Sequence, residues 1–330
     1  MANAAGNSKR KNQLTFAAVA VGAVGLVGLG FWSSKRGTSR EPLALVDSAK
    51  GEFFIVQVHR VNSGDSGRSS SWYEYQAYSL EDGSELGMVE IGANAQVFGS
   101  FEDFVWFDLQ RNAGLANMRT GEWVVQSSAM AERHSQLGPT LDVCRPNAPR
   151  FNGPFDPETG DLCVTGTNGL SYLLSIHGDL TPLPEELDAW PERTCPSNHW
   201  RVHDSEECIG VQPHPEGGFS VKSTLGWTSE PMLGPLPLRG PYGAAQRFGG
   251  SELLVIEHDN PGATIKHYAA LDNEGRTVWK LESDALGHSP RSLMVEATDA
   301  HIVLASSGEH PVFVTVHDLR DGSKLREFEL

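Results

Sequence analysis

The sequence predicts an all-β protein of the β-propeller class, with about six four-stranded blades, preceded by a single N-terminal transmembrane helix. A strand–turn–strand pattern recurs along most of the chain. Glycine and proline are abundant, at 35 and 19 of 330 residues, and one long uncharged apolar run lies near the amino terminus. Such frequent turn residues favour many short strands over long helices.

The predicted transmembrane helix is Leu14 to Trp32, LTFAAVAVGAVGLVGLGFW, which contains no charged residue. An α-helix of about 20 apolar residues crosses the hydrocarbon layer of a membrane. Basic residues lie on both sides of the run, at positions 9–11 and at Lys35, Arg36 and Arg40, so their count leaves the orientation open. A cleavable signal peptide is the alternative, although its apolar region is usually shorter.

The clearest repeat unit is His267–Glu282, HYAALDNEGRTVWKLE. Two segments of strand composition flank Gly275, which can take the positive φ of a tight hairpin turn without a Cβ clash. The 97 residues from Gly178 to Gly275 are about twice the 47 residues from Gly275 to Gly322. The same pattern surrounds four further turn glycines, at Gly83, Gly121, Gly178 and Gly322.

One or two further short strands are predicted before each hairpin, for example Glu252–His258 and His301–Ser306. Four short antiparallel strands per repeat are typical of a propeller blade. A period of 20–50 residues indicates a repeat architecture, and the residues after position 42 accommodate about six such units. A two-sheet β-sandwich is the alternative, but a sandwich does not require turns at a regular interval.

The segment 269–282, AALDNEGRTVWKLE, resembles the repeat of pyrroloquinoline-quinone-type propellers: a strand, Leu-Asp, a glycine turn and a Trp shortly after it. Thr120–Trp123 and Asp318–Gly322 match this repeat in part. The resemblance implies a propeller fold and is shared with periplasmic assembly scaffolds. Quinone-dependent enzymes of the family use two adjacent cysteines, which this chain lacks, so we expect neither the quinone nor another cofactor.

The regular spacing of predicted turns is interrupted between positions 138 and 215, where proline is frequent and all four cysteines occur. We expect insertions there, held by two disulfides. Cys144–Cys163 and Cys195–Cys208 are the first choice because they close short loops, although four cysteines allow three pairings. Persistent disulfides require an oxidising compartment, which indicates an extracytoplasmic domain, periplasmic or at the cell surface.

These observations predict an order of segments along the chain. They are a cytoplasmic tail at 1–13, a transmembrane anchor at 14–32, a polar linker at 33–42, and a propeller domain at 43–330 with Pro/Cys-rich insertions at 138–215.

A zinc site is the alternative for part of the cysteine-rich window. Cys195, His199, His203 and Cys208 are ligand types that zinc prefers, and the two histidines have an H-x3-H spacing. Such a site would leave Cys144 and Cys163 unexplained. Two disulfides account for all four cysteines, so we expect no metal.

Charge and motifs limit the function. A formal net charge of −16 repels nucleic acid phosphates and anionic lipid, so we expect no nucleic acid partner. Gly64–Gly67 shares four residues with the serine segment of chymotrypsin-like proteases, without the rest of that machinery, and we assign no catalytic residue. We expect a membrane-anchored scaffold that binds a protein or a small ligand and is not an enzyme. The alternative is a hydrolase or lyase with its site in the central funnel.

Overall fold

The computed structural model describes residues 36–63, 69–110, 112–144, 155–156, 159–183, 195–196, 199–202, 205–238, 245–258, 266–282, 292–307 and 311–330. Within these residues the chain forms six antiparallel sheets, which follow one another in chain order, and one short helix, α2 (Ser127–Arg133). We number the sheets 1 to 6.

The strands are assigned as follows. Sheet 1 contains β1 (Arg36–Val46), β2 (Phe53–Ser63), β3 (Ser69–Ser79) and β4 (Glu85–Ile91). Sheet 2 contains β5 (Gln96–Phe101), β6 (Phe104–Asp108), β7 (Ala113–Asn117) and β8 (Glu122–Gln126), and sheet 3 contains β9 (Asp142–Val143), β10 (Leu162–Thr165), β11 (Ser171–Leu174) and β12 (Leu180–Pro182). Sheet 4 contains β13 (His199–Arg201), β14 (Cys208–Pro213) and β15 (Phe219–Ser223). Sheet 5 contains β16 (Pro235–Pro237), β17 (Arg247–Phe248), β18 (Leu253–His258), β19 (His267–Leu271) and β20 (Thr277–Glu282), and sheet 6 contains β21 (Ser292–Ala297), β22 (His301–Ser307), β23 (Val312–Asp318) and β24 (Lys324–Glu329).

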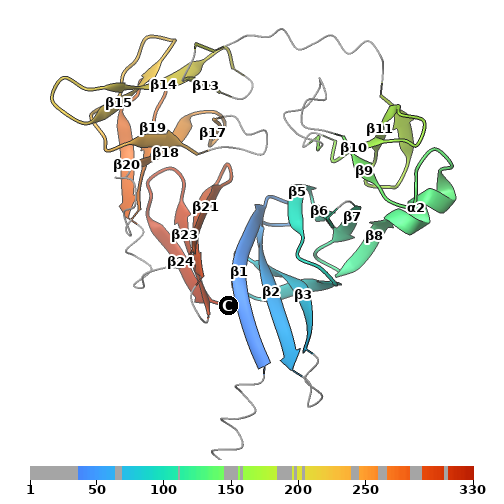
Figure 1. Cartoon of the computed structure of the whole chain (residues 1–330). Helices are drawn as coiled ribbons and strands as arrows, with labels where there is room; N and C mark the ends of the chain where they lie inside the picture. Colours follow the sequence, from blue (N-terminus) through green and yellow to red (C-terminus); the bar gives the residue numbers. More distant parts are fainter. Residues whose placement is uncertain are drawn as a thin grey trace, which may run out of the picture.

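The hydrophobic core lies between the sheets. Buried clusters join sheets 1 and 2, 2 and 3, 4 and 5, and 5 and 6. Sheet 6 packs on sheet 1, where Phe54 contributes to the same cluster as Val314. A cycle of consecutive antiparallel sheets that pack face to face is a β-propeller architecture. Figure 1 shows the sheets set around a centre, with the red sheet 6 beside the blue sheet 1. This is not the pair of facing sheets of a β-sandwich.

The five predicted turn glycines share one structural position, the connection between the third and fourth strand of a sheet. Their φ angles lie between +72° and +78°. Gly226 occupies the corresponding connection of sheet 4, where Thr228 and Met232 bridge to β15 in place of a regular fourth strand. It lies 48 residues after Gly178 and 49 before Gly275, so it fills the gap of double length.

Strand β1 begins inside the segment 33–42 that the sequence predicts to be a linker. From Arg36 to Pro42 its backbone pairs with residues 56–62 of β2. The polar side chains of this segment carry no apolar alternation, because this end of β1 does not build the core. Pairing with β2 therefore makes it a strand, and the boundary at position 42 is corrected to Arg36.

Residues 1–35, which include the predicted anchor Leu14 to Trp32, lie outside the described part of the chain. Among the described residues, no helix has the length and apolar character needed to cross a membrane.

Candidate functional site

One face of the molecule is formed by connections between strands. In an antiparallel meander, the connection from strand 1 to strand 2 and the connection from strand 3 to strand 4 lie at the same end of the sheet. In this chain these connections carry many of the charged side chains that contact a neighbouring sheet. We call this end of the sheets the loop face.

A groove of about 610 Å³ opens on the loop face above sheet 1. Both loop-face connections of that sheet line it, at residues 48–52 and 79–84. Arg119 enters from sheet 2, while His301 and Arg326 enter from sheet 6. The groove thus brings together segments of three sheets that are far apart in the sequence.

Asp103 anchors one wall of this groove. Its side chain is 2% exposed and accepts hydrogen bonds from Ser48 Oγ (2.7 Å), Lys50 Nζ (2.6 Å) and Arg119 Nε (3.0 Å). Burial alone would raise the pKa of Asp103, but the hydrogen bonds from Lys50, Ser48 and Arg119 outweigh it and hold the pKa below its ordinary value. The charged wall is therefore held in one arrangement by its own partners.

Glu52 anchors the opposite wall. Its carboxylate bonds the Thr298 hydroxyl and contacts His301 Nδ1, so it links sheet 1 to the first connection of sheet 6. The pKa of nearby Asp47 is raised by partial desolvation and by the negative charges of Glu52 and Asp299. This wall concentrates carboxylates beside a single histidine.

A second groove, of about 450 Å³, lies at the equivalent place on sheet 5. Glu252 stands where Glu52 stands in the first groove, and residues 272–276 form its turn wall. Arg320 of the next sheet lines it just as Arg119 lines the first, and each arginine precedes its turn glycine by two residues. The repeat therefore places the same kind of groove at two positions around the loop face.

Both grooves use one repeated acidic position. The residue immediately before the second main strand is Asp or Glu in five of the six described sheets. In three of these sheets the carboxylate is shown to reach a neighbouring sheet, and these are Glu52, Asp103 and Glu207. The full set is Glu52, Asp103, Asp161, Glu207 and Glu252.

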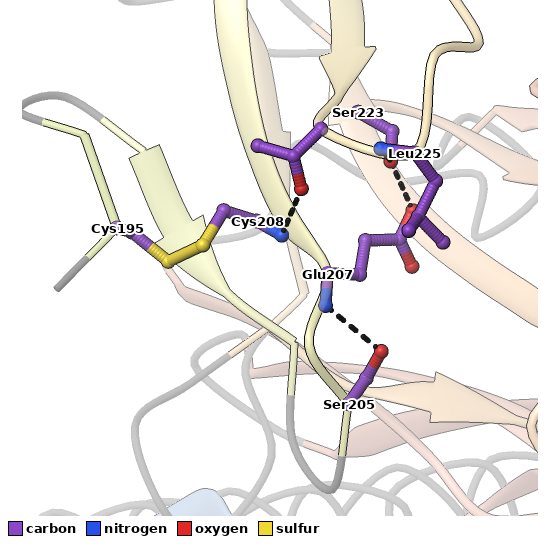
Figure 2. The surroundings of a disulfide bond; sticks show 7 residues. Cys195, Ser205, Glu207, Cys208, Ser223 and Leu225 are labelled. Atoms are coloured by element: carbon purple, nitrogen blue, oxygen red, sulfur yellow. Dashed lines mark hydrogen bonds between the residues drawn. A yellow bond between two sulfur atoms is a disulfide. The ribbon is translucent and has the colours of Figure 1, made fainter. Parts of the chain in front are cut away.

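Glu207 forms the most enclosed of these contacts. It is 2% exposed, receives two hydrogen bonds from Arg247 of sheet 5 (2.9 and 3.2 Å), and accepts others from Ser223 Oγ and the Trp227 indole. The next residue, Cys208, forms a disulfide with Cys195, and Figure 2 shows this bond beside Glu207. This buried ion pair, in which Nε and Nη2 of Arg247 donate to the Glu207 carboxylate, joins sheets 4 and 5.

One further carboxyl group lies between the first strands of sheets 6 and 1. Glu296 Oε2 of β21 accepts a hydrogen bond from the backbone N–H of Leu45 in β1 (2.5 Å). Burial raises the pKa of Glu296 to about 7, and the Leu45 N–H opposes that rise only in part. It is thus a carboxyl group that changes charge near neutral pH.

The cysteines are joined as Cys144–Cys163 and Cys195–Cys208, the pairing that the spacing favours. Cys195 and Cys208, ligands of the alternative zinc site, are therefore disulfide sulfurs rather than thiolates. His203 lies outside the described residues, and the ring of His199 lies against Gly210. Across the described chain, no group of three or more His, Cys, Asp and Glu is arranged to hold a metal ion.

The sequence does not identify Asp103, Glu207, Glu296 or their partners as functional candidates. Glu52 and His301, for example, are 249 residues apart. One signal is present in the sequence: the predicted strand Glu252–His258 begins with an acidic residue, and Asp103 likewise precedes the apolar residues 104–107. Aligning the repeats on their turn glycines would have shown this acidic position.

No protein-family model matches the chain, and no curated protein sequence matches it either. Among solved structures, BamB from Moraxella catarrhalis is 12% identical, with a TM-score of 0.22, over 88% of this chain and 90% of that one. The β-propeller domain of the Trilobed protease from Pyrococcus furiosus is 7% identical, with a TM-score of 0.30, over 88% and 84% of the two chains. The dihydro-heme d1 dehydrogenase NirN is 10% identical, with a TM-score of 0.29, over 88% and 78%. Similarities at this level assign neither a family nor a function, and the resemblance to pyrroloquinoline-quinone-type repeats stays a prediction.

Proposed function

We propose that this protein is a membrane-anchored, extracytoplasmic six-bladed scaffold whose loop face binds another protein. The observation that carries the proposal is the groove above sheet 1, which three sheets build together. A partner seated there contacts segments of the chain that only the closed fold brings into one place. The equivalent groove on sheet 5 offers a second contact of the same design.

The charges of the first groove favour recognition over catalysis. Asp103 is held by Ser48, Lys50 and Arg119, and Glu52 is held by Thr298 and His301. A side chain fixed by such partners presents a preorganised surface, which lowers the ordering cost of binding. The same donors occupy the carboxylate oxygens, which a general base would need free to take a proton from a substrate.

The location in this proposal rests on the disulfides and on the apolar run. Two disulfides in one domain indicate an oxidising compartment. The uncharged residues 14–32 have the length of a membrane span. Together these favour a cytoplasmic tail at 1–13 and a propeller outside the cytoplasm, periplasmic or at the cell surface.

Site-specific crosslinking in membranes tests the proposed binding face. A photoreactive residue at Glu81 in the first groove, and another at Arg320 in the second, should capture the same partner. Lys222, an exposed residue of β15 that lines neither groove, is the control position. Charge reversal by Glu81→Lys or Arg320→Glu should weaken capture and leave thermal stability unchanged. Equal capture at Lys222, or none at either groove, would contradict the proposal.

Glu296 supports a second candidate, an extracytoplasmic hydrolase or lyase with its site in the central funnel. A carboxyl group with a pKa of about 7 can donate or accept a proton near neutral pH. In this case, turnover of an ester, glycoside or uronide by the purified protein would be lost in Glu296→Gln. Turnover unchanged in that variant would remove the one observation that favours an enzyme.

A further inference from the structure

The first three strands of sheet 1 are longer than its fourth strand. Strands β1, β2 and β3 have 11 residues each, but β4 has seven and pairs with β3 only between Tyr73 and Tyr78. Beyond Tyr73 the first three strands continue as a three-stranded ribbon, made of residues 36–38, 60–63 and 69–72. Its end lies opposite the loop face, and Figure 1 shows β1 and β2 running on past β24 and β8.

One side of this ribbon carries arginine and tryptophan. Arg60 pairs with Trp72 across β2 and β3, and Arg40 pairs with Val58, two residues from Arg60. Paired residues and residues two apart share one side of a sheet, so Arg40, Arg60 and Trp72 lie together. Glu74 lies on the same side, in the row of Arg40 and Val58, one row nearer the body than Arg60 and Trp72. It accepts bonds from Arg60 Nε (2.6 Å) and from the Trp72 indole. Arg60 remains 37% exposed.

The chain before the ribbon indicates what lies next to it. Thirty-five residues precede Arg36, and their apolar run ends at Trp32. Four residue steps between Trp32 and Arg36 span at most about 14 Å of extended chain. With Leu14 to Trp32 in the bilayer, the end of the ribbon therefore lies within reach of the lipid headgroups.

The positive charges at this end of sheet 1 also favour contact with an anionic membrane. The chain as a whole has a formal net charge of −16, so most of its surface is repelled by an anionic membrane. Arg60, 37% exposed, lies on the ribbon, and Arg40 lies one row behind it, on the side of sheet 1 that also carries the buried Val58 and the carboxylate of Glu74. Guanidinium groups bind phosphate with directed, charge-assisted hydrogen bonds, and tryptophan favours the membrane interface.

We propose that this end of sheet 1 docks on anionic phospholipid headgroups through Arg60 and Trp72 of the ribbon and Arg40 of the row behind them. The inference rests on the anchor of the proposed function and adds an orientation to it. The loop face, at the other end of the same strands, is then held away from the membrane. A partner reaches both grooves from the side opposite the bilayer.

Hydrogen–deuterium exchange of the full chain in lipid nanodiscs tests this docking. The probe is the nanodisc itself, of phosphatidylcholine alone or with phosphatidylglycerol, compared with detergent micelles. Amides on the outer edge of residues 69–72 lie beyond the reach of β4, so they exchange readily unless a surface covers them. We expect these amides to exchange more slowly in the anionic nanodisc. Arg40→Gln and Arg60→Gln should each reduce this protection about fivefold.

Arg320→Gln, on the loop face, is the matched control and should retain the protection. Equal exchange in anionic and zwitterionic nanodiscs would overturn the docking, and so would protection that survives loss of both arginines. Carbonate extraction of native membranes is run alongside. A chain that stays in the membrane with an unprotected ribbon disproves only the docking, whereas a chain released by carbonate disproves the anchor and the docking together.

Discussion

Two junctions of the ring differ in how neighbouring sheets are joined. Sheets 6 and 1 hold opposite ends of the chain, yet they share a buried cluster that includes Phe54 and Val314. Sheets 3 and 4 are neighbours in sequence, yet no hydrophobic cluster of the described residues joins them. Both disulfides lie beside this junction: Cys144–Cys163 joins β10 to the residue after β9, and Cys195–Cys208 joins β14 to the segment that precedes β13.

The turn glycines show the same contrast. Five of them lie against a residue of the preceding sheet or of the helix that follows it, as Gly322 lies against Trp279 and Gly83 against Phe328. At Gly226, the glycine of sheet 4, an added Cβ meets nothing within 4 Å among the described residues. Apolar packing between sheets closes the ring where its ends meet, whereas disulfides stabilise the short strands on either side of the 3–4 junction.

The largest expected loss of stability comes from a substitution at the junction of sheets 6 and 1. Phe54→Ala removes a fully buried ring between sheets 6 and 1 and should lower the free energy of unfolding by about 3–5 kcal/mol. Leu225→Ala, on the open side of sheet 4 where Leu225 is 67% exposed, should change it by no more than about 0.5 kcal/mol. Urea titration followed by tryptophan fluorescence measures both. Similar losses in the two variants would show that the junctions do not differ.

The next effect concerns the covalent support of sheet 4. Replacing Cys195 and Cys208 together by Ser removes a bond that spans 13 residues and should lower stability by about 2–4 kcal/mol. The loss should appear first around β13, which has only three residues. Hydrogen exchange resolved by segment measures it, with β22 and β23 as the reference. Early exchange in β22 and β23 as well would mean that the disulfide supports the whole ring.

The sequence predicts the parts of this comparison that are local. A hairpin turn depends on a few adjacent residues, so the glycines at 83, 121, 178, 275 and 322 mark real connections. Gly226 is missed because Thr224-Leu225-Gly226-Trp227 leads into two isolated bridges, at Thr228 and Met232, and not into a regular fourth strand. In the sequence, only the double-length interval between Gly178 and Gly275 indicates that a turn glycine lies between them.

The residues of the loop face are not local and could not be predicted in the same way. Whether Glu52 meets His301 depends on which turn of sheet 6 lies above sheet 1, and that follows from closure of the ring. The first strand is missed for a related reason. At its polar end β1 is specified by its partner β2, and no apolar alternation of its own marks it.

A smaller effect compares two glycines directly. Gly322→Ala and Gly226→Ala both put a Cβ on a residue with positive φ, +72° and +102°, which costs roughly 1 kcal/mol in each case. At Gly322 the new Cβ also meets the Trp279 ring at 3.0 Å, which should add about 1–2 kcal/mol. Thermal melting of the two variants gives the difference. Equal melting temperatures would place a neighbour against Gly226 as well.

The smallest effect tests the closing junction through pH. The folded-state pKa of Glu296, about 7, lies above its ordinary value of 4.5, so the folded protein holds this proton in a range where the unfolded chain has lost it. Stability from this group is therefore complete below pH 4.5 and is lost as the pH rises toward 7. The expected loss is about 1 kcal/mol, because the side chain keeps some contact with water.

Glu296→Gln removes the charge and can keep the bond to the Leu45 N–H through its amide oxygen. The stability of this variant should not fall between pH 4.5 and 7, so it should exceed the wild type at pH 8 and match it near pH 4.5. Glu257→Gln, in sheet 5, is the control, since Glu257 is paired with Lys266 at 2.6 Å. Glu296 is the carboxyl group that accepts the Leu45 N–H across the junction of sheets 6 and 1. If the wild-type pH profile were retained in Glu296→Gln, the pH dependence of stability would arise from another group.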